Sequence, residues 1–215
     1  MLGILFLFLL ISSMNFYSGH TYHVYNQGNN KQKIFFESEN YLYFLEKMVY
    51  HLSPHVEFLA WCLMPNHFHW LVKVKESYIS PPKFENKQKL VDPLNRSIGS
   101  LQGSYTQAIN KKYDRSGSLF RTRTKAKSLR EDEDHTGNYG VNCFFYIHQN
   151  PIRAGLVKKM EDWKYSSFRD YAGFRNGKLC NKELANDLFN LPKNPDEFYD
   201  VSQQTIPEFI VQKLY

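Results

Sequence analysis

The chain has 215 residues, 42% of them hydrophobic and 16% aromatic. This composition excludes a disordered chain, and the length fits one domain with an extension or two small domains. A formal net charge of +6 favours an anionic partner, most commonly nucleic acid. The three cysteines, Cys62, Cys143 and Cys180, form no C-x-x-C pair, which argues for reduced thiols in the cytoplasm and against a disulfide framework or a thiolate zinc site.

The N-terminal segment is the one part that suggests another compartment. Residues 2–11 are almost wholly apolar, but the run is too short to span a bilayer as a helix, and no Lys or Arg precedes it. Because Met14 begins an ordinary polar stretch, residues 1–13 are interpreted as an upstream mis-start or a weak targeting segment. We therefore expect a cytoplasmic protein with no membrane partner.

The remaining sequence predicts alternating strands and helices. In chain order these are a strand over residues 22–26, a helix from Ser38, strands over 56–63 and 67–74, a loop over 77–93, a helix over 94–109, a strand over 118–127, an acidic turn over 131–140 and a helix over 141–148 that stops at Asn150-Pro151. This order is typical of the α+β class, with an antiparallel sheet covered by helices on one face. From residue 161 the pattern changes to short helical pieces, so we expect a domain over 14–160 and a small helical C-terminal extension over 161–215.

Two histidines flank Phe68 in the predicted strand over 67–74. Side chains two apart on a strand point to the same face, so His67 and His69 lie together while Phe68 and Trp70 face the core. Two neighbouring imidazoles can bind one divalent cation, although a third protein group, a water or a substrate phosphate has to complete the shell. From this pattern alone, a histidine pair on a solvent-exposed face remains the alternative.

A cationic segment follows the predicted helix over 94–109. Residues 111–130 contain eight basic residues and one acidic residue, Asp114. Within the predicted strand the cations alternate with neutral residues, so they form one face that suits a phosphate backbone. A charged edge strand that resists aggregation is the alternative. The predicted nucleic-acid contacts are Arg121, Arg123, Lys125, Lys127, Lys111 and Lys112.

The predicted helix over 141–148 carries one further pair. Tyr146 and Asn150 are four residues apart, so they share a face of the helix. A tyrosine can act as a covalent nucleophile, and an amide oxygen one turn later can complete a metal shell. A core tyrosine and an asparagine that caps the helix before Pro151 are the alternative.

Five strings in this order resemble one family: MPNHFHWLV, GSYTQAINKKY, GSLFRTRTKAK, YIHQNPIRAGLV and DWKYSSFRDY. They resemble the single-tyrosine HUH transposases of small insertion sequences, in the branch of the REP-associated tyrosine transposases, from Tyr22 to Tyr171. The resemblance implies a ferredoxin-like α+β domain and an enzyme of DNA transposition that binds single-stranded DNA with hairpins. It also implies that DNA is cleaved and rejoined through a 5′-phosphotyrosine intermediate, with Mg²⁺ or Mn²⁺ held by the His-Phe-His motif.

The family's residues carry over unequally. His67 and His69 match the metal ligands directly. In the REP-associated branch a tyrosine commonly stands where this chain has Thr124. In the other insertion-sequence branch the tyrosine lies in a helical string with a glutamine ligand one turn later, and the counterparts here are Tyr146 as nucleophile and Asn150 as third ligand.

Thr124 motivates a second hypothesis, a domesticated protein that binds DNA or RNA hairpins without cutting them. A structural metal protein is a third. The resemblance leaves the oligomeric state open, because insertion-sequence members typically act as homodimers whereas REP-associated members act as monomers.

Overall fold

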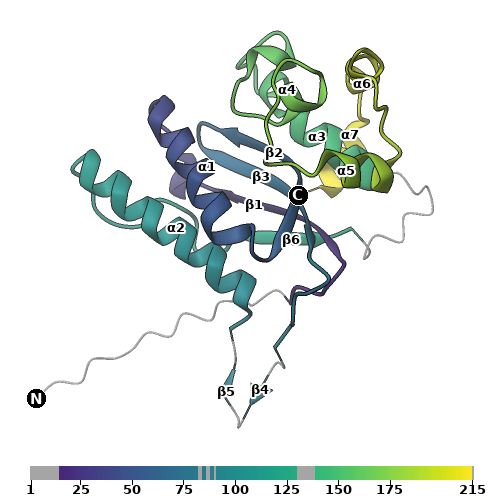
Figure 1. The fold of residues 1–215 in the computed structure, drawn as a ribbon. Coiled ribbons are helices and arrows are strands. Elements are labelled where there is room, and N and C mark those ends of the chain that lie inside the picture. The colour runs from purple at the N-terminus through teal and green to yellow at the C-terminus, as the bar shows by residue number, and fades with distance from the viewer. Residues whose placement is uncertain (1–14, 82–83, 86–87, 90, 130–138, 215) are drawn as a thin grey trace, which may run out of the picture.

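The computed structural model describes residues 15–81, 84–85, 88–89, 91–129 and 139–214. Within these residues, four strands form an antiparallel sheet in the order β2-β3-β1-β6, and two short strands form a separate hairpin (Figure 1). The strands are β1 (Thr21–Gln27), β2 (Val56–Met64), β3 (His67–Val74), β4 (Phe84–Glu85), β5 (Gln88–Lys89) and β6 (Lys125–Ser128). The helices are α1 (Ser38–Leu52), α2 (Pro93–Lys112), α3 (Tyr139–Arg153), α4 (Phe168–Tyr171), α5 (Lys182–Phe189), α6 (Pro195–Ser202) and α7 (Glu208–Lys213). The predicted α+β class with an antiparallel sheet is confirmed.

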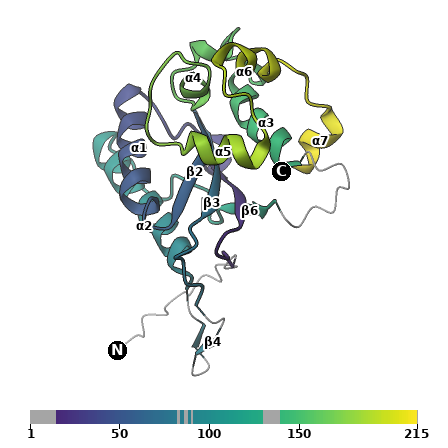
Figure 2. The same ribbon diagram turned by 45° about the vertical axis from the view of Figure 1, so that its right-hand side comes forward.

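Helices α1 and α2 cover one face of the sheet (Figure 2). Apolar residues recur every three or four positions in both helices, so each turns one apolar stripe inward. Phe44 of α1 contacts Phe68 and Trp70 of β3, with ring centroids 5.5 and 6.0 Å apart. Asp92 caps α2, because its side chain accepts a hydrogen bond from the Leu94 backbone at 3.0 Å. This layer fixes which face of β3 is the core face.

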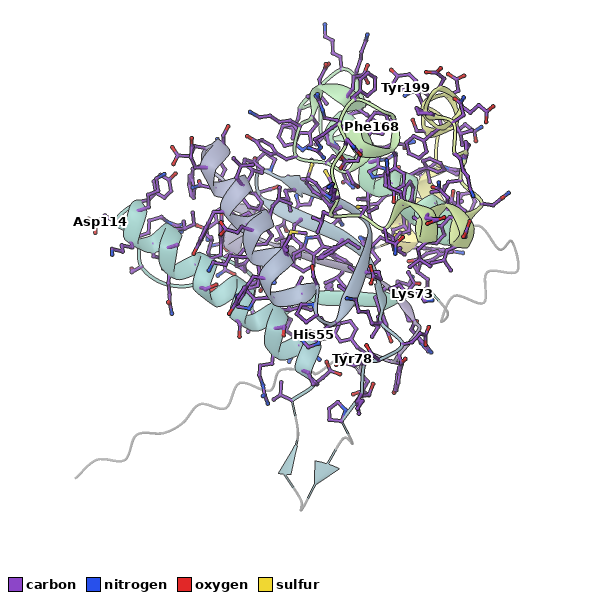
Figure 3. The ribbon with its side chains drawn as sticks, viewed as in Figure 1. His55, Lys73, Tyr78, Asp114, Phe168 and Tyr199 are labelled. Atoms are coloured by element: carbon purple, nitrogen blue, oxygen red, sulfur yellow. The ribbon has the colours of Figure 1, made fainter. Side chains whose placement is uncertain are left out.

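Helix α3 packs against the opposite face, over β2 and β3 (Figure 2). The Tyr146 ring of α3 lies edge-on to His69, with the ring centroids 5.8 Å apart. The expectation of helices on one face therefore holds for α1 and α2, while α3 adds a second layer that the element order did not indicate. Phe198 of α6 extends this layer, since its ring contacts Phe144 and Phe168 at 6.1 and 6.0 Å (Phe168 is labelled in Figure 3).

The basic strand is shorter than predicted. Residues 118–124, all of them described, contain one isolated bridge and no regular strand. The Asn26 side chain explains this, because its Nδ2 donates to the Arg121 carbonyl at 3.1 Å and to Thr124 Oγ1 at 3.0 Å. These bonds replace the main-chain ladder that a paired strand would form. The prediction of a strand over 118–127 is therefore wrong for residues 118–124.

Helix α3 continues past Asn150-Pro151, where the sequence predicted its end. A proline removes one main-chain hydrogen bond, but the N–H of Ala154 still donates to the Asn150 carbonyl at 2.9 Å. The Asn150 side chain adds another bond, since its Nδ2 donates to the Tyr146 carbonyl at 2.9 Å. The turn ends at Gly155, whose φ of +67° is accessible to glycine at little cost.

None of the described helices is long and apolar enough to cross a membrane. The expected N-terminal segment, residues 1–13, lies outside the described residues, as does most of the predicted acidic turn over 131–140. The predicted loop over 77–93 includes the short hairpin of β4 and β5.

Candidate DNA and metal site

The two histidines of β3 lie side by side, as the alternation of the strand predicts. Their ring centroids are 5.0 Å apart, and the ring planes are nearly perpendicular, at 89°. His67 is partly buried, whereas His69 is fully buried. The solvent-exposed alternative is therefore wrong for His69.

Both imidazoles are neutral at neutral pH. Burial lowers the pKa of His67 to about 4, and an interaction with the Asn150 side chain opposes this effect only in part. Burial also lowers the pKa of His69 well below its ordinary value, and the neighbouring His67 and His23 rings act in the same direction. A neutral imidazole has the free lone pair that a metal ion requires.

Helix α3 brings Tyr146 and Asn150 to the same place. Asn150 lies beside the His67 ring, and Tyr146 contacts the His69 ring edge-on. Because Asn150 Nδ2 bonds to the Tyr146 carbonyl, its Oδ1 is the atom that can act as a ligand. Tyr146 itself is only 2% exposed. The structure thus unites four residues that come from two separate strings of the sequence.

The donor set is suited to a divalent ion with an open shell. It offers two imidazole nitrogens and one amide oxygen, from His67, His69 and Asn150. Among the residues that the structure describes, no three His, Cys, Asp or Glu side chains lie together in a way that could hold a metal ion. Water or phosphate oxygens would therefore fill the remaining positions, as Mg²⁺ and Mn²⁺ sites on phosphate substrates commonly require.

Strand β1 contributes two residues that the sequence patterns did not single out. Its register with β3 places Tyr25 directly opposite His69. The Tyr25 ring stacks on His69 and on His23, with centroids 5.7 and 4.9 Å apart. His23 Nε2 lies 2.9 Å from His69 Nδ1, and both rings are fully buried. The alternation of β1 already puts His23 and Tyr25 on one face, but only the strand order places that face beside β3.

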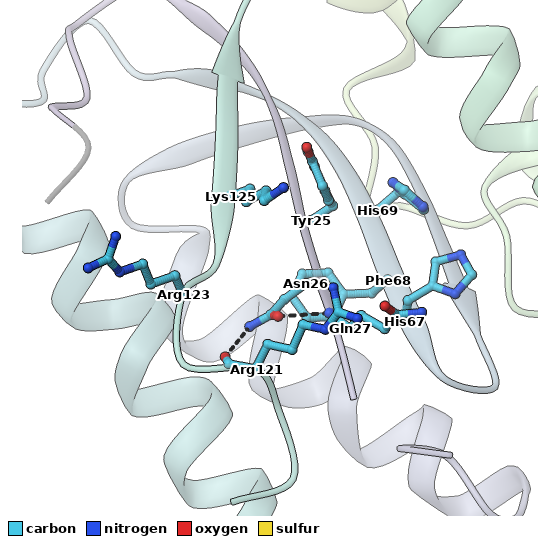
Figure 4. Close-up of a pocket in the computed structure, with 9 residues that line it drawn as sticks. All are labelled: Tyr25, Asn26, Gln27, His67, Phe68, His69, Arg121, Arg123 and Lys125. Atoms are coloured by element: carbon cyan, nitrogen blue, oxygen red, sulfur yellow. Dashed lines mark hydrogen bonds between the residues drawn. The ribbon is translucent and has the colours of Figure 1, made fainter. Parts of the chain in front are cut away.

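A pocket of about 140 Å³ opens between β1, β3 and the segment that leads into β6 (Figure 4). Its lining consists of Tyr25, Asn26, Gln27, His67, Phe68, His69, Arg121, Arg123 and Lys125. Arg121 is held in place by its backbone N–H, which donates to the Gln27 carbonyl at 2.8 Å. Three predicted cationic contacts therefore line the same pocket as the two histidines, although the two arginines precede β6. We call this the histidine pocket.

No family model matches the chain. A Haemophilus influenzae protein, a REP-associated tyrosine transposase by name, is 29% identical over 115 residues, which are 52% of this chain and 58% of that protein. The solved structure of a REP-associated tyrosine transposase bound to a REP hairpin is 18% identical, with a TM-score of 0.52, and the match covers 74% of this chain and 82% of that chain. This chain resembles the REP-associated tyrosine transposases. The resemblance inferred from the five strings is confirmed, and the fold is that of these transposases.

Thr124, for which the resemblance implies a tyrosine, is directed away from the histidine pocket. Its Oγ1 accepts hydrogen bonds from Asn26 Nδ2 at 3.0 Å and from Gln102 Nε2 of α2 at 2.7 Å. Thr124 therefore bonds to the helix-covered side of the sheet.

The other predicted cations also lie outside the histidine pocket. Lys127 Nζ donates to the Lys213 carbonyl at 2.6 Å, at the C-terminal end of α7. Lys111 and Lys112 end α2, which lies on the opposite face of the sheet, and Lys112 forms an ion pair with Glu37. The predicted set of six cations is thus divided between two faces of the molecule.

Proposed function

We propose that this chain binds single-stranded and hairpin DNA at the histidine pocket and cleaves and rejoins it through a covalent tyrosine link. The observation that carries this proposal is the pocket itself, where two neutral histidines and three cations share one face beside Tyr146. Guanidinium and ammonium groups suit phosphate oxygens, and the related solved structure is bound to a REP hairpin.

The proposed chemistry is a phosphoryl transfer to Tyr146. The phenol loses its proton and its oxygen bonds to the phosphorus, while the bond from phosphorus to the 3′ oxygen breaks. The departing 3′ oxygen takes up a proton, which leaves a 5′-phosphotyrosine link and a free 3′-OH. Because a phosphoester is conserved, the reverse reaction rejoins strands without ATP.

The residues around the scissile phosphate would stabilise its developing charge. Arg121, Arg123 and Lys125 supply positive charge at the pocket wall. A Mg²⁺ or Mn²⁺ ion held by His67, His69 and Asn150 would supply Lewis-acid stabilisation at the same phosphate.

The substitution Tyr146→Phe tests the nucleophile. Labelled hairpin DNA with a single-stranded flank is incubated with Mn²⁺, and the covalent adduct is resolved on a denaturing gel. We expect the adduct to disappear in Tyr146→Phe while hairpin affinity changes by less than about two-fold, because only the hydroxyl is removed. Tyr50→Phe is the matched control, since Tyr50 is 74% exposed on α1, on the far face of the sheet.

An adduct that persists in Tyr146→Phe would show that another phenol attacks. Tyr25 is then the next residue to change, because it lines the histidine pocket opposite His69. If the adduct is lost only in Tyr25→Phe, the nucleophile is Tyr25 of β1.

Hairpin binding without cleavage is the second candidate function. The small exposure of Tyr146 and the Thr124 side chain, bonded away from the pocket, favour it. Absence of an adduct with Mg²⁺ and with Mn²⁺, together with retained hairpin binding in a gel-shift assay, would support this function and overturn the first.

A further inference from the structure

We infer that an unpaired base of the single-stranded DNA beside the hairpin stacks on the Phe36 ring, an inference that rests on the DNA binding of the proposed function. Phe36 lies directly before the N-cap of α1 and is 42% exposed. The Tyr113 ring lies beside it, with the ring centroids 4.7 Å apart. The Arg115 guanidinium lies over the Phe36 ring, 5.7 Å from its centroid. We call these three residues the Phe36 cluster.

Packing at the start of α1 does not account for the position of Phe36. An apolar residue before the N-cap often packs against the fourth residue of the helix, which is Tyr41 here. In this chain Phe35 makes that contact, because its ring is buried and stacks on Tyr41 with the centroids 4.4 Å apart. The neighbouring Phe36 is therefore left at the surface.

Hydrogen bonds hold the Phe36 cluster in one arrangement. Oδ1 of the buried Asn40 accepts from the Phe36 backbone N–H at 2.9 Å and from Tyr113 Oη at 3.1 Å. Arg115 Nη2 donates to Gln32 Oε1 at 2.6 Å. A surface that is ordered before it binds loses little conformational freedom when a base stacks on it.

The surroundings of Phe36 are cationic. Residues 31–37 and 111–115 contain five basic residues and two acidic ones, Glu37 and Asp114 (Asp114 is labelled in Figure 3). Glu37 already forms an ion pair with Lys112. Proteins that bind single-stranded nucleic acids combine positive charge with aromatic rings on which bases stack. The charge and the exposed ring together favour a DNA strand over an apolar protein partner.

A short hydrogen-bonded segment joins the Phe36 cluster to the histidine pocket. Gln32, which accepts from Arg115, donates from its Nε2 to the Leu119 carbonyl at 3.1 Å. Two residues later, the Arg121 backbone N–H bonds to β1 at the pocket. The chain from Arg115 to Arg121 can span at most about 20 Å. A single-stranded flank of a few nucleotides can therefore reach from the pocket to this cluster.

The affinity for DNA is measured first, by fluorescence anisotropy without metal, on labelled single-stranded oligothymidylate and on a blunt hairpin. We expect Phe36→Ala to weaken binding of the single strand by about 5- to 150-fold, the range for the loss of one stacked base. Binding of the blunt hairpin should change by less than about two-fold, and Phe36→Trp, which keeps an aromatic face, should bind the single strand within about three-fold of wild type. Phe174→Ala is the matched control, because Phe174 is 50% exposed and its ring lies near Tyr199, outside this cluster.

The stacked base is located second, with 2-aminopurine, a fluorescent base whose emission falls when it stacks on an aromatic ring. It is placed at each position of a single-stranded flank in turn. We expect the emission to fall at one position with wild type and to stay high there with Phe36→Ala and with Phe36→Leu. Leucine keeps an apolar contact with Tyr113 but has no aromatic face, so a fall that persists in Phe36→Leu would overturn the inference.

The remaining outcomes separate the inference from the proposed function. Unchanged affinity for the single strand in Phe36→Ala, with a covalent adduct still formed, would overturn the inference and leave the proposed function standing. Single-strand binding that depends on Phe36, in a protein that forms no adduct, would support the inference and overturn the proposed cleavage. A wild type that does not bind the single strand would overturn the inference whatever its affinity for the hairpin.

Discussion

Three of the described histidines are fully buried, and two of them, His23 and His69, belong to the site. The third, His148, lies among aromatic rings of α3, α4 and α6, where its Nε2 bonds to Ser167 Oγ at 2.7 Å. Burial lowers the pKa of His148 to about 3. Its imidazole is therefore neutral throughout the ordinary pH range of folding.

The buried His148 predicts a loss of stability in acid. An unfolded histidine takes up a proton near pH 6.5, whereas folded His148 takes it up only near pH 3. Between these values the unfolded state binds more protons, so stability is full above pH 6.5 and falls as the pH falls toward 3. Each unit of pKa shift corresponds to about 1.4 kcal/mol. Thermal melts between pH 7 and 4 should show a shallower fall of Tm in His148→Gln than in wild type.

His51→Gln is the control for this measurement. His51 is only partly buried, and burial and then Lys47 lower its pKa. Its variant should change the slope less than His148→Gln does, because the His51 ring is closer to solvent. An unchanged slope in His148→Gln would contradict the assignment of acid sensitivity to this residue.

At the residue scale, the sequence predicts only those neighbours that share an element. Period-two alternation puts His67 and His69 together, and helical spacing puts Tyr146 and Asn150 together. His23 lies far away in the sequence, and its contact with His69 depends on the pairing of β1 with β3. No local pattern contains that information.

At the element scale, the segment before β6 shows how one side chain can alter a strand. The alternation RTRTKAK is typical of a strand, yet Asn26 bonds to Arg121 and Thr124 and interrupts the ladder. The two arginines still reach the pocket, because the Arg121 backbone N–H bonds to Gln27 of β1. Part of the predicted cationic surface is therefore retained, although Arg121 and Arg123 lie in an irregular segment and not in a strand.

The pocket cations predict the salt dependence of DNA binding. Each phosphate that a cation neutralises on single-stranded DNA contributes a log–log slope of about −0.7. We expect Arg121→Ala to weaken hairpin binding and to reduce the magnitude of this slope by about 0.7, measured by fluorescence anisotropy at several salt concentrations. Lys47→Ala on α1 is the control, and it should leave the slope unchanged. An unchanged slope in Arg121→Ala would remove this residue from the DNA contact.

The same titration tests Lys111 and Lys112, which the sequence predicted as contacts and the structure places at the end of α2. A reduced slope in Lys111→Ala would mean that DNA also contacts the helix-covered face. An unchanged slope would restrict binding to the face of the histidine pocket.

At the scale of the whole molecule, the residues of the expected C-terminal extension complete the sheet domain. The Leu63 backbone N–H on β2 donates to the Tyr165 carbonyl at 2.9 Å, and Tyr171 Oη donates to the Leu59 carbonyl at 2.5 Å. These contacts cover the outer edge of β2, which would otherwise be open to pairing with another chain. The buried side chains of both parts form one hydrophobic cluster.

This shared core predicts one cooperative unfolding transition. Phe198 is fully buried and contacts rings of α3 and α4, so Phe198→Ala should cost about 3–5 kcal/mol of unfolding free energy. Guanidinium denaturation is followed both by tryptophan fluorescence and by far-UV circular dichroism. The midpoints of both signals should shift together to a lower guanidinium concentration. Two separate transitions, of which Phe198→Ala shifts only the one at the lower guanidinium concentration, would instead support an independent unit over residues 161–215.

The predicted boundary at residue 161 rests on a change in the pattern of apolar residues, which reports local structure and not packing. Short amphipathic helices have the same sequence pattern whether they form a separate arm or pack onto the core of the domain. The aromatic contacts of Phe198 and the strand-like contact of Tyr165 with β2 depend on the third dimension. Pattern alone therefore could not show how these helices pack.

The strand order β2-β3-β1-β6 also has a consequence for protein synthesis. Strand β1 emerges from the ribosome early, whereas β6, which pairs with its other edge, is translated only after β2, β3 and α2. A nascent chain can therefore pair β1 with β3 and bring His23 and Tyr25 beside His69 before Arg121, Arg123 and Lys125 have been made. The imidazoles of the histidine pocket would be assembled first, and its positive charge would be added last.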